Sequence, residues 1–232
     1  MQLTLRALAR LLGYPSAELK AHLPEVREAL RSEGALPAAV RDALEPLLRR
    51  IETGDLLDLQ SDYSELFDRS RSLSLHLFEH VHGDNRERGQ AMIDLGQQYL
   101  DAGFYLDSGE LPDFVPVFLE YASCLPASEA REMLGQPVHV FVALAERLDK
   151  REALHAGIFH ALVALAGERP DADALAELQQ REPEDDPAKL DAEWEEAPVT
   201  FNATAAHEMG GPTGVVAKIR AANRATNREA GR

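Results

Sequence analysis

The sequence has a single cysteine, Cys124, and a single tryptophan, and it contains few strand-forming residues. One cysteine excludes an intrachain disulfide and any cysteine cluster that holds zinc or an iron–sulfur centre. No apolar run approaches the roughly 20 residues that cross a bilayer, and arginines interrupt the apolar face of the first ten residues, unlike a signal-peptide core. We therefore expect a cytoplasmic protein that is not membrane-embedded.

Positive charge is also scarce relative to negative charge. The 232 residues include 40 acidic and 24 basic side chains, which gives a formal net charge of −16. Such a chain repels phosphate backbones, so we expect no nucleic-acid partner. A basic peptide, in contrast, would be attracted to it. Neither G-x-G-x-x-G nor a Walker-type phosphate loop occurs, and we expect no bound cofactor.

Leu, Ala, Glu and Arg dominate the rest of the chain and favour helix. Apolar residues recur at spacings of three and four, and turn residues separate these runs. We predict an all-α, single-domain multi-helix bundle. The expected helices cover about residues 3–12, 16–30 with a break or kink at Pro24, 37–51, 55–67, 72–81, 85–100, 113–121, 127–148 with an interruption at Gly135 and Pro137, and 152–166.

The character of the chain changes at Glu168. Residues 168–196 contain twelve acids and three bases, and only the run around Leu175 and Leu178 has the pattern of a packed helix. We therefore predict a helical domain over residues 1–167, an acidic tail over 168–201 with an anchor that contains Trp194 and Phe201, and a disordered tail over 202–232.

Three of the eight histidines lie within seven residues, His76 to His82. His76, Glu79 and His80 match the H-x-x-E-H pattern, in which a helix presents two imidazoles to zinc and a glutamate to water. His82 falls on another face of a helix and supplies no third ligand. A zinc hydrolase is therefore the alternative hypothesis. The favoured interpretation gives the histidines packing or peptide-contact roles, with no catalytic residue and no metal.

A second unusual stretch runs from Glu110 to Phe118. Asp113 has the position of a helix N-cap, and Glu110 would favour the helix dipole. The two carboxylates beside Phe114 and Phe118 would also suit a groove for an apolar peptide with basic flanks. The two roles can coexist, and we expect this stretch to face the histidine stretch across one site.

These stretches resemble a known family. The run Tyr63-Ser-Glu-Leu-Phe67-Asp68, the segment Arg71 to Gly83, Arg88 to Met92, Glu110 to Tyr121 and Trp194-Glu-Glu resemble the respiratory nitrate reductase assembly chaperones, the NarJ or delta-chain family. The resemblance covers about residues 1–201. The wider TorD and DmsD group of redox-enzyme chaperones has E-P-x-D-H where this chain has Glu-Leu-Pro-Asp-Phe, which fits the nitrate reductase branch better.

The resemblance implies a TorD/NarJ-like helical fold and a chaperone without catalysis of its own. Such proteins bind the N-terminus of the apo nitrate reductase alpha subunit, which resembles a vestigial twin-arginine leader. They keep that enzyme competent for molybdenum cofactor insertion and delay its membrane docking. Cofactor-biosynthesis proteins are further expected partners, and the chain itself is expected as a monomer or weak homodimer. A helical adaptor unconnected with molybdenum enzymes is a third hypothesis.

The predicted peptide-binding site combines apolar side chains with carboxylates that attract basic flanks. His76 and His80 would make its affinity depend on pH near neutrality. The site consists of Phe67, Asp68, Arg71, Leu75, His76, Phe78, Glu79, His80, Glu110, Pro112, Asp113, Phe114 and Phe118.

Overall fold

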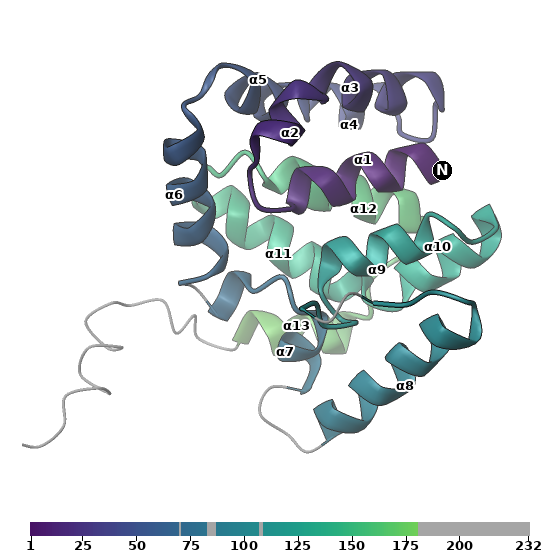
Figure 1. Cartoon of the computed structure of the whole chain (residues 1–232). Coiled ribbons are helices and arrows are strands. Elements are labelled where there is room, and N and C mark those ends of the chain that lie inside the picture. Colours follow the sequence, from purple (N-terminus) through teal and green to yellow (C-terminus); the bar gives the residue numbers. More distant parts are fainter. Residues whose placement is uncertain (70, 83–86, 107–108, 181–232) are drawn as a thin grey trace, which may run out of the picture. The chain divides into compact units, whose positions relative to one another are not determined.

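The computed structural model describes residues 1–69, 71–82, 87–106 and 109–180 (Figure 1). These residues belong to one compact unit and form α-helices and one 3₁₀ turn, with no strand among them, so the predicted all-α fold is confirmed. None of the helices in these ranges is long and apolar enough to cross a membrane. The elements are α1 (Gln2–Leu12), α2 (Ala17–Ala21), α3 (Leu23–Ser32), α4 (Ala38–Asp42), α5 (Glu45–Thr53), α6 (Leu56–Phe67), η1 (Arg71–Leu73), α7 (Leu77–His82), α8 (Glu87–Asp101), α9 (Val115–Ala122), α10 (Ala127–Gly135), α11 (Val138–Lys150), α12 (Ala156–Ala166) and α13 (Ala172–Gln180).

The core is built around α1, α11 and α12. Helices α11 and α12 pack along each other, and α1 packs against α9. Phe141 and Phe159 are fully buried, with ring centroids 6.3 Å apart. Leu5, Leu8 and Leu12 of α1 are also fully buried. Leu3 is exposed and Thr4 is buried, so the buried face of α1 passes through Thr4.

Prolines set two of the helix boundaries. Pro24 lies in the first turn of α3, so the predicted break after α2 is confirmed. The single helix predicted over 37–51 is wrong, because the chain forms α4 and α5 with a break at Ala43 and Leu44. Pro46 lies in the first turn of α5, where its missing N–H costs no helical hydrogen bond.

Side-chain N-caps start two of the helices. Ser16 accepts a hydrogen bond from the backbone N–H of Leu19 at 3.1 Å and starts α2. Asp55 accepts one from Leu57 at 2.9 Å and starts α6. These local caps satisfy N–H groups that have no partner within their own helix.

Helix α1 has no cap of this local kind, and a distant carboxylate serves instead. Glu33 accepts hydrogen bonds from the backbone N–H of Leu3 and Thr4, at 3.2 and 2.8 Å, and from the Thr4 hydroxyl at 2.7 Å. It also pairs with the N-terminal ammonium of Met1. Burial raises the pKa of the Glu33 carboxyl, but these hydrogen bonds outweigh burial and lower it to about 2.

Helical packing continues past residue 167, where we expected the tail to begin. The run around Leu175 and Leu178 forms α13, which packs against α11 and buries Leu178. The guanidinium of Arg147 on α11 donates to the carbonyls of Leu178 and Ser72, at 2.7 and 2.8 Å. The predicted anchor at Trp194 and Phe201 and the tail over 202–232 lie outside the described residues.

Candidate functional site

The chain from residue 71 to 82 is not the continuous helix that we predicted. It forms the turn η1, a short extended segment through His76, and then α7. His76 and Phe114 form an isolated antiparallel bridge. The N–H of Val115 donates to the carbonyl of Leu75 at 2.8 Å, and the N–H of Leu77 donates to that of Asp113 at 3.0 Å. Backbone pairing with the second stretch replaces helical hydrogen bonds here and brings the two stretches side by side.

Asp113 caps a helix, but a different one from the helix that we predicted. Its side chain is fully buried, and Oδ2 accepts a hydrogen bond from the backbone N–H of Phe78 at 3.0 Å. Oδ1 lies 3.2 Å from Nδ1 of His76. Asp113 therefore caps α7 across the bridge. Helix α9 begins after Phe114 with no side-chain cap, and Pro116 occupies its first turn.

His76 is the half-buried member of this arrangement. Its ring lies 5.3 Å from that of Phe114, tilted by 33°. The hydrogen bond with Asp113 raises the pKa of His76; burial opposes this, while the negative charges of Asp113 and Glu79 add to it. A protonated His76 is thus favoured by its surroundings, and its side chain is 30% exposed.

The geometry does not supply the zinc site of the alternative hypothesis. His76 precedes α7, so His76 and His80 do not share one helical face. His80 is buried, and its Nε2 lies 2.8 Å from the carbonyl of Ser74. Glu79 pairs with Arg88 at 3.0 Å. In the part of the chain that the structure describes, no three His, Cys, Asp or Glu side chains are grouped to hold a metal ion.

The predicted site residues divide by exposure. Asp68, Arg71 and Glu110 are exposed, and His76, Phe78, Glu79, Pro112 and Phe114 are half-buried. Three predicted apolar contacts are instead covered by the protein itself, and we assign them to core packing. These are Phe67, Leu75 and Phe118.

Asp68 and Glu110 are far apart in the sequence but act on the same buried side chain. Burial raises the pKa of the Tyr63 hydroxyl, and the negative charges of Asp68 and Glu110 raise it further. That hydroxyl donates to the carbonyl of Leu12 at 2.9 Å. Both predicted carboxylates therefore act on the Tyr63 hydroxyl, which lies at the C-terminal end of α1.

The sequence prediction missed the contribution of α8. Tyr99 is its one buried residue; the hydroxyl of Tyr99 donates to the carbonyl of Pro112 at 2.9 Å and so connects α8 to the second stretch. Of the nine large apolar side chains exposed among the described residues, five lie between residues 81 and 111. These are Val81, Ile93, Leu100, Tyr105 and Leu111.

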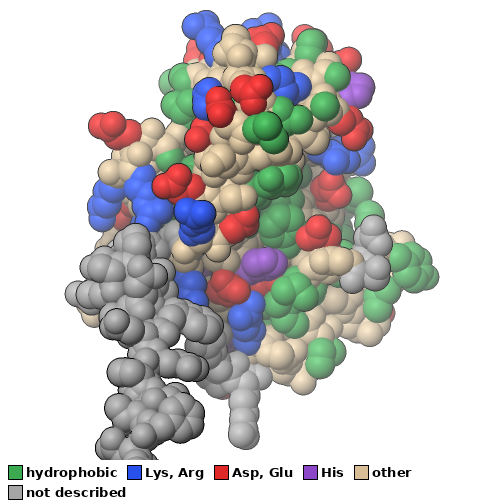
Figure 2. Space-filling view, turned by 60° about the vertical axis from the view of Figure 1, so that its left-hand side comes forward, with side chains coloured by type: hydrophobic (Ala, Val, Ile, Leu, Met, Phe, Trp, Pro, Cys, Tyr) green, Lys and Arg blue, Asp and Glu red, His purple; other side chains and the backbone are tan. Residues whose placement is uncertain are grey.

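Exposed apolar side chains of this kind offer contact area to a partner where they lie next to one another. Figure 2 shows hydrophobic, acidic, basic and histidine side chains next to one another on one face of the molecule. The helical spacing of apolar residues did not reveal these exposed side chains. The same spacing also describes an apolar face that the core covers. The short helix α7 is the element against which α8 packs most extensively.

Comparison with known proteins places the chain in a family. The sequence pattern of the nitrate reductase delta subunit matches residues 33–161. The chain is 48% identical over 195 residues to the nitrate reductase molybdenum cofactor assembly chaperone NarJ of Escherichia coli (strain K12), covering 84% of this chain and 83% of that protein. It is 44% identical over 179 residues to NarW of the same strain, covering 75% and 78% respectively.

A solved structure supports the fold. The chain is similar to a candidate redox enzyme maturation protein from Archaeoglobus fulgidus, with a TM-score of 0.53 and 19% identity, covering 72% of this chain and 94% of that one. This likeness concerns the helical architecture alone. The match over residues 33–161 contains α4 to α11, and with them both stretches of the candidate site. On these sequence matches, the chain belongs to the nitrate reductase delta subunit family.

Proposed function

We propose that this chain is a non-catalytic assembly chaperone of nitrate reductase that works in the cytoplasm. It binds the leader-like N-terminal segment of the apo alpha subunit and holds that enzyme competent for molybdenum cofactor insertion before membrane docking. Proteins that synthesise or deliver the cofactor are its further partners. The observation that carries this proposal is the 48% identity to the Escherichia coli chaperone along most of both chains.

The geometry of the two paired stretches supports peptide recognition. Phe78 and Phe114 are half-buried, so each retains apolar surface for a partner. Asp68 and Glu110 are exposed carboxylates that attract a basic segment. An amphipathic helix with basic flanks presents the complementary surface. In this arrangement the side chains recognise a peptide and break no bond.

Titration calorimetry with a synthetic peptide of the alpha-subunit N-terminus tests the proposal. We expect saturable binding by the full chain that weakens as salt concentration increases, because exposed charges are screened. The double variant Asp68→Ala/Glu110→Ala should lose about tenfold in affinity, which corresponds to about 1.4 kcal/mol.

The matched control is Glu25→Ala/Glu28→Ala, which removes the same charge from exposed positions on α3. Equal affinities of the two double variants would contradict the assignment of Asp68 and Glu110 to the site. No binding of the peptide by the unmodified chain would contradict leader recognition itself.

A cellular experiment tests the assembly role separately from peptide affinity. In a strain without its own delta-chain proteins, we expect nitrate reductase to accumulate without molybdenum, and expression of this chain to restore its molybdenum content. Full molybdenum content in the absence of the chain would contradict an assembly role, whatever the peptide affinity.

A further inference from the structure

A hollow lies on the surface between α3, α4 and α5. Its volume is about 650 Å³, within the range of about 300–1,000 Å³ of small-molecule sites. Its lining combines charged side chains with the apolar Leu30, Pro46 and Leu48. Figure 1 draws α3 to α5 at the opposite end of the view from α7 and α8, so this hollow is distinct from the site described above.

The charge of the hollow is opposite to that of the chain. Four arginines line it, against two carboxylates, in a protein whose formal net charge is −16. Arg27 and Arg31 come from α3, Arg41 from α4 and Arg49 from α5. Three helices that are separate in sequence thus bring guanidinium groups to one place.

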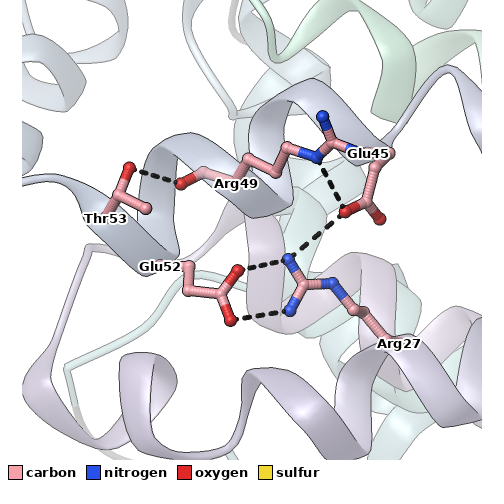
Figure 3. Close-up of polar contacts among 5 residues, drawn as sticks. All are labelled: Arg27, Glu45, Arg49, Glu52 and Thr53. Atoms are coloured by element: carbon pink, nitrogen blue, oxygen red, sulfur yellow. Dashed lines mark hydrogen bonds and ion pairs between the residues drawn. The ribbon is translucent and has the colours of Figure 1, made fainter.

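Two of these arginines are already neutralised. Arg27 donates to both oxygens of Glu52, at 3.1 and 2.7 Å, and to Glu45 at 3.4 Å (Figure 3). Arg49 donates to the same oxygen of Glu45 at 3.3 Å. The buried Nε of Arg27 has no hydrogen-bond partner among the described residues. Arg27 is therefore held in place by two carboxylates, while Arg49 shares one of them from an exposed position.

The other two arginines retain binding capacity. Arg31 is exposed and forms no hydrogen bond or ion pair with any residue that the structure describes. Within the part of the chain that the structure describes, Arg41 pairs only with its sequence neighbour Asp42, whose side chain is 69% exposed. Arg41 is half-buried and Asp42 is exposed, and an ion pair at the surface contributes about 0–1 kcal/mol, so an anionic ligand can replace it at small cost.

We propose that this hollow binds the phosphate or pyrophosphate group of a small phosphorylated molecule. Guanidinium groups match phosphate oxygens with paired hydrogen bonds, and Arg31 and Arg41 supply two such groups. Pro46 is exposed and offers apolar surface to the organic part of the ligand, whereas Leu30 and Leu48 are almost fully buried. The proposal goes beyond the chaperone function and does not depend on it.

Calorimetric titration of the full chain with inorganic pyrophosphate, at constant ionic strength, tests the proposal. We expect one saturable site. Arg31→Gln/Arg41→Gln should weaken binding by at least about tenfold, because it removes both guanidinium groups proposed to hold the phosphate oxygens. Arg31 has no partner to lose and Arg41 only a weak one, so the urea midpoint of this variant should stay close to that of the unmodified chain.

The control Arg10→Gln/Lys150→Gln removes the same positive charge from exposed positions outside the hollow. It should leave pyrophosphate affinity unchanged. An equal loss of affinity in both double variants, or no saturable binding by the unmodified chain, would overturn the proposal.

Two further ligands identify which part of the molecule is recognised. A nucleoside diphosphate should bind more tightly than pyrophosphate, because its organic part covers the exposed side chain of Pro46. Inorganic phosphate should bind more weakly than pyrophosphate, because it spans the two guanidinium groups less well. Equal affinity for phosphate and pyrophosphate would contradict the role of both arginines. Leader-peptide affinity, measured in the same samples, should not change with either double variant.

Discussion

A distant carboxylate caps each of two helices in the described part of the chain, α1 and α7. Glu33 caps α1, and Asp113 caps α7. Helix α1 is covered along its length and buries seven residues, whereas α7 is short and carries α8, which buries one. The two caps therefore have different roles. The cap of α1 stabilises the core, and the cap of α7 fixes the position of a lightly packed surface that carries exposed apolar side chains. Variants in the two regions should separate stability from binding.

The largest effect on stability is expected from Glu33→Ala. The pKa of Glu33 falls from 4.5 to about 2 on folding, which gives about 3 kcal/mol of stability at neutral pH. Because the folded pKa is lowered, this stability is present above about pH 4.5 and is lost as the pH falls towards 2. Urea unfolding at several pH values measures it, with the exposed Glu28→Ala as control. Leader-peptide affinity should not change. A loss of affinity alongside the loss of stability would contradict the assignment of Glu33 to stability alone.

Asp113→Ala should lower the free energy of unfolding less than Glu33→Ala does, and should lower peptide affinity more. It leaves the N–H of Phe78 without its acceptor and His76 without its partner, at a cost of about 2 kcal/mol. Since Asp113 fixes the start of α7, we expect peptide affinity to fall as well. Titration calorimetry and urea unfolding on the same sample measure both. A stability loss with unchanged affinity would show that α7 does not form part of the binding surface.

A smaller, pH-dependent effect is expected from His76→Gln. Asp113 raises the pKa of His76 on folding, so protonated His76 stabilises the folded state. That contribution is complete below the unfolded pKa of about 6.5 and is lost as the pH rises through the higher folded value. The variant should therefore lose stability in acid and little in base. A loss that is the same at every pH would mean that packing against Phe114, and not charge, carries the effect.

The smallest stability effect is expected from Ile93→Ser on α8. The side chain is 65% exposed, so the free energy of unfolding should change by no more than about 0.5 kcal/mol. If the exposed surface of α8 takes part in recognition, peptide affinity should still decrease. Leu57→Ser is the matched control, because Leu57 is 75% exposed near the start of α6. Equal affinity in both variants would remove α8 from the site.

Much of the architecture could be predicted because its causes are local. Ser16 and Asp55 cap the helices that they immediately precede, and Pro24 and Pro46 each lie in a first helical turn. Even so, Pro46 was not recognised as a boundary, because the apolar spacing of residues 37–51 continues through it. Proline in a first turn is compatible with helix, so periodicity hides the break.

The candidate site was predicted less completely, for a physical reason. The sequence predicted both stretches, and His76, Phe114 and Glu110 in them are half-buried or exposed in the structure. It could not separate Phe67 and Phe118, which the core covers, from Phe78 and Phe114, which keep exposed surface. An apolar side chain has the same pattern whether its neighbour is the core or a partner.

What the sequence determined by itself is the helical class, most helix boundaries, the family and the excess of negative charge. Hydrogen bonds within a helix and local caps join residues close in sequence, so these features are written in short patterns. Only the tertiary structure placed Glu33 on α1, Asp113 on α7 and four arginines around one hollow. Each of these arrangements joins residues that are distant in the sequence. A local sequence pattern does not determine which distant side chains come into contact.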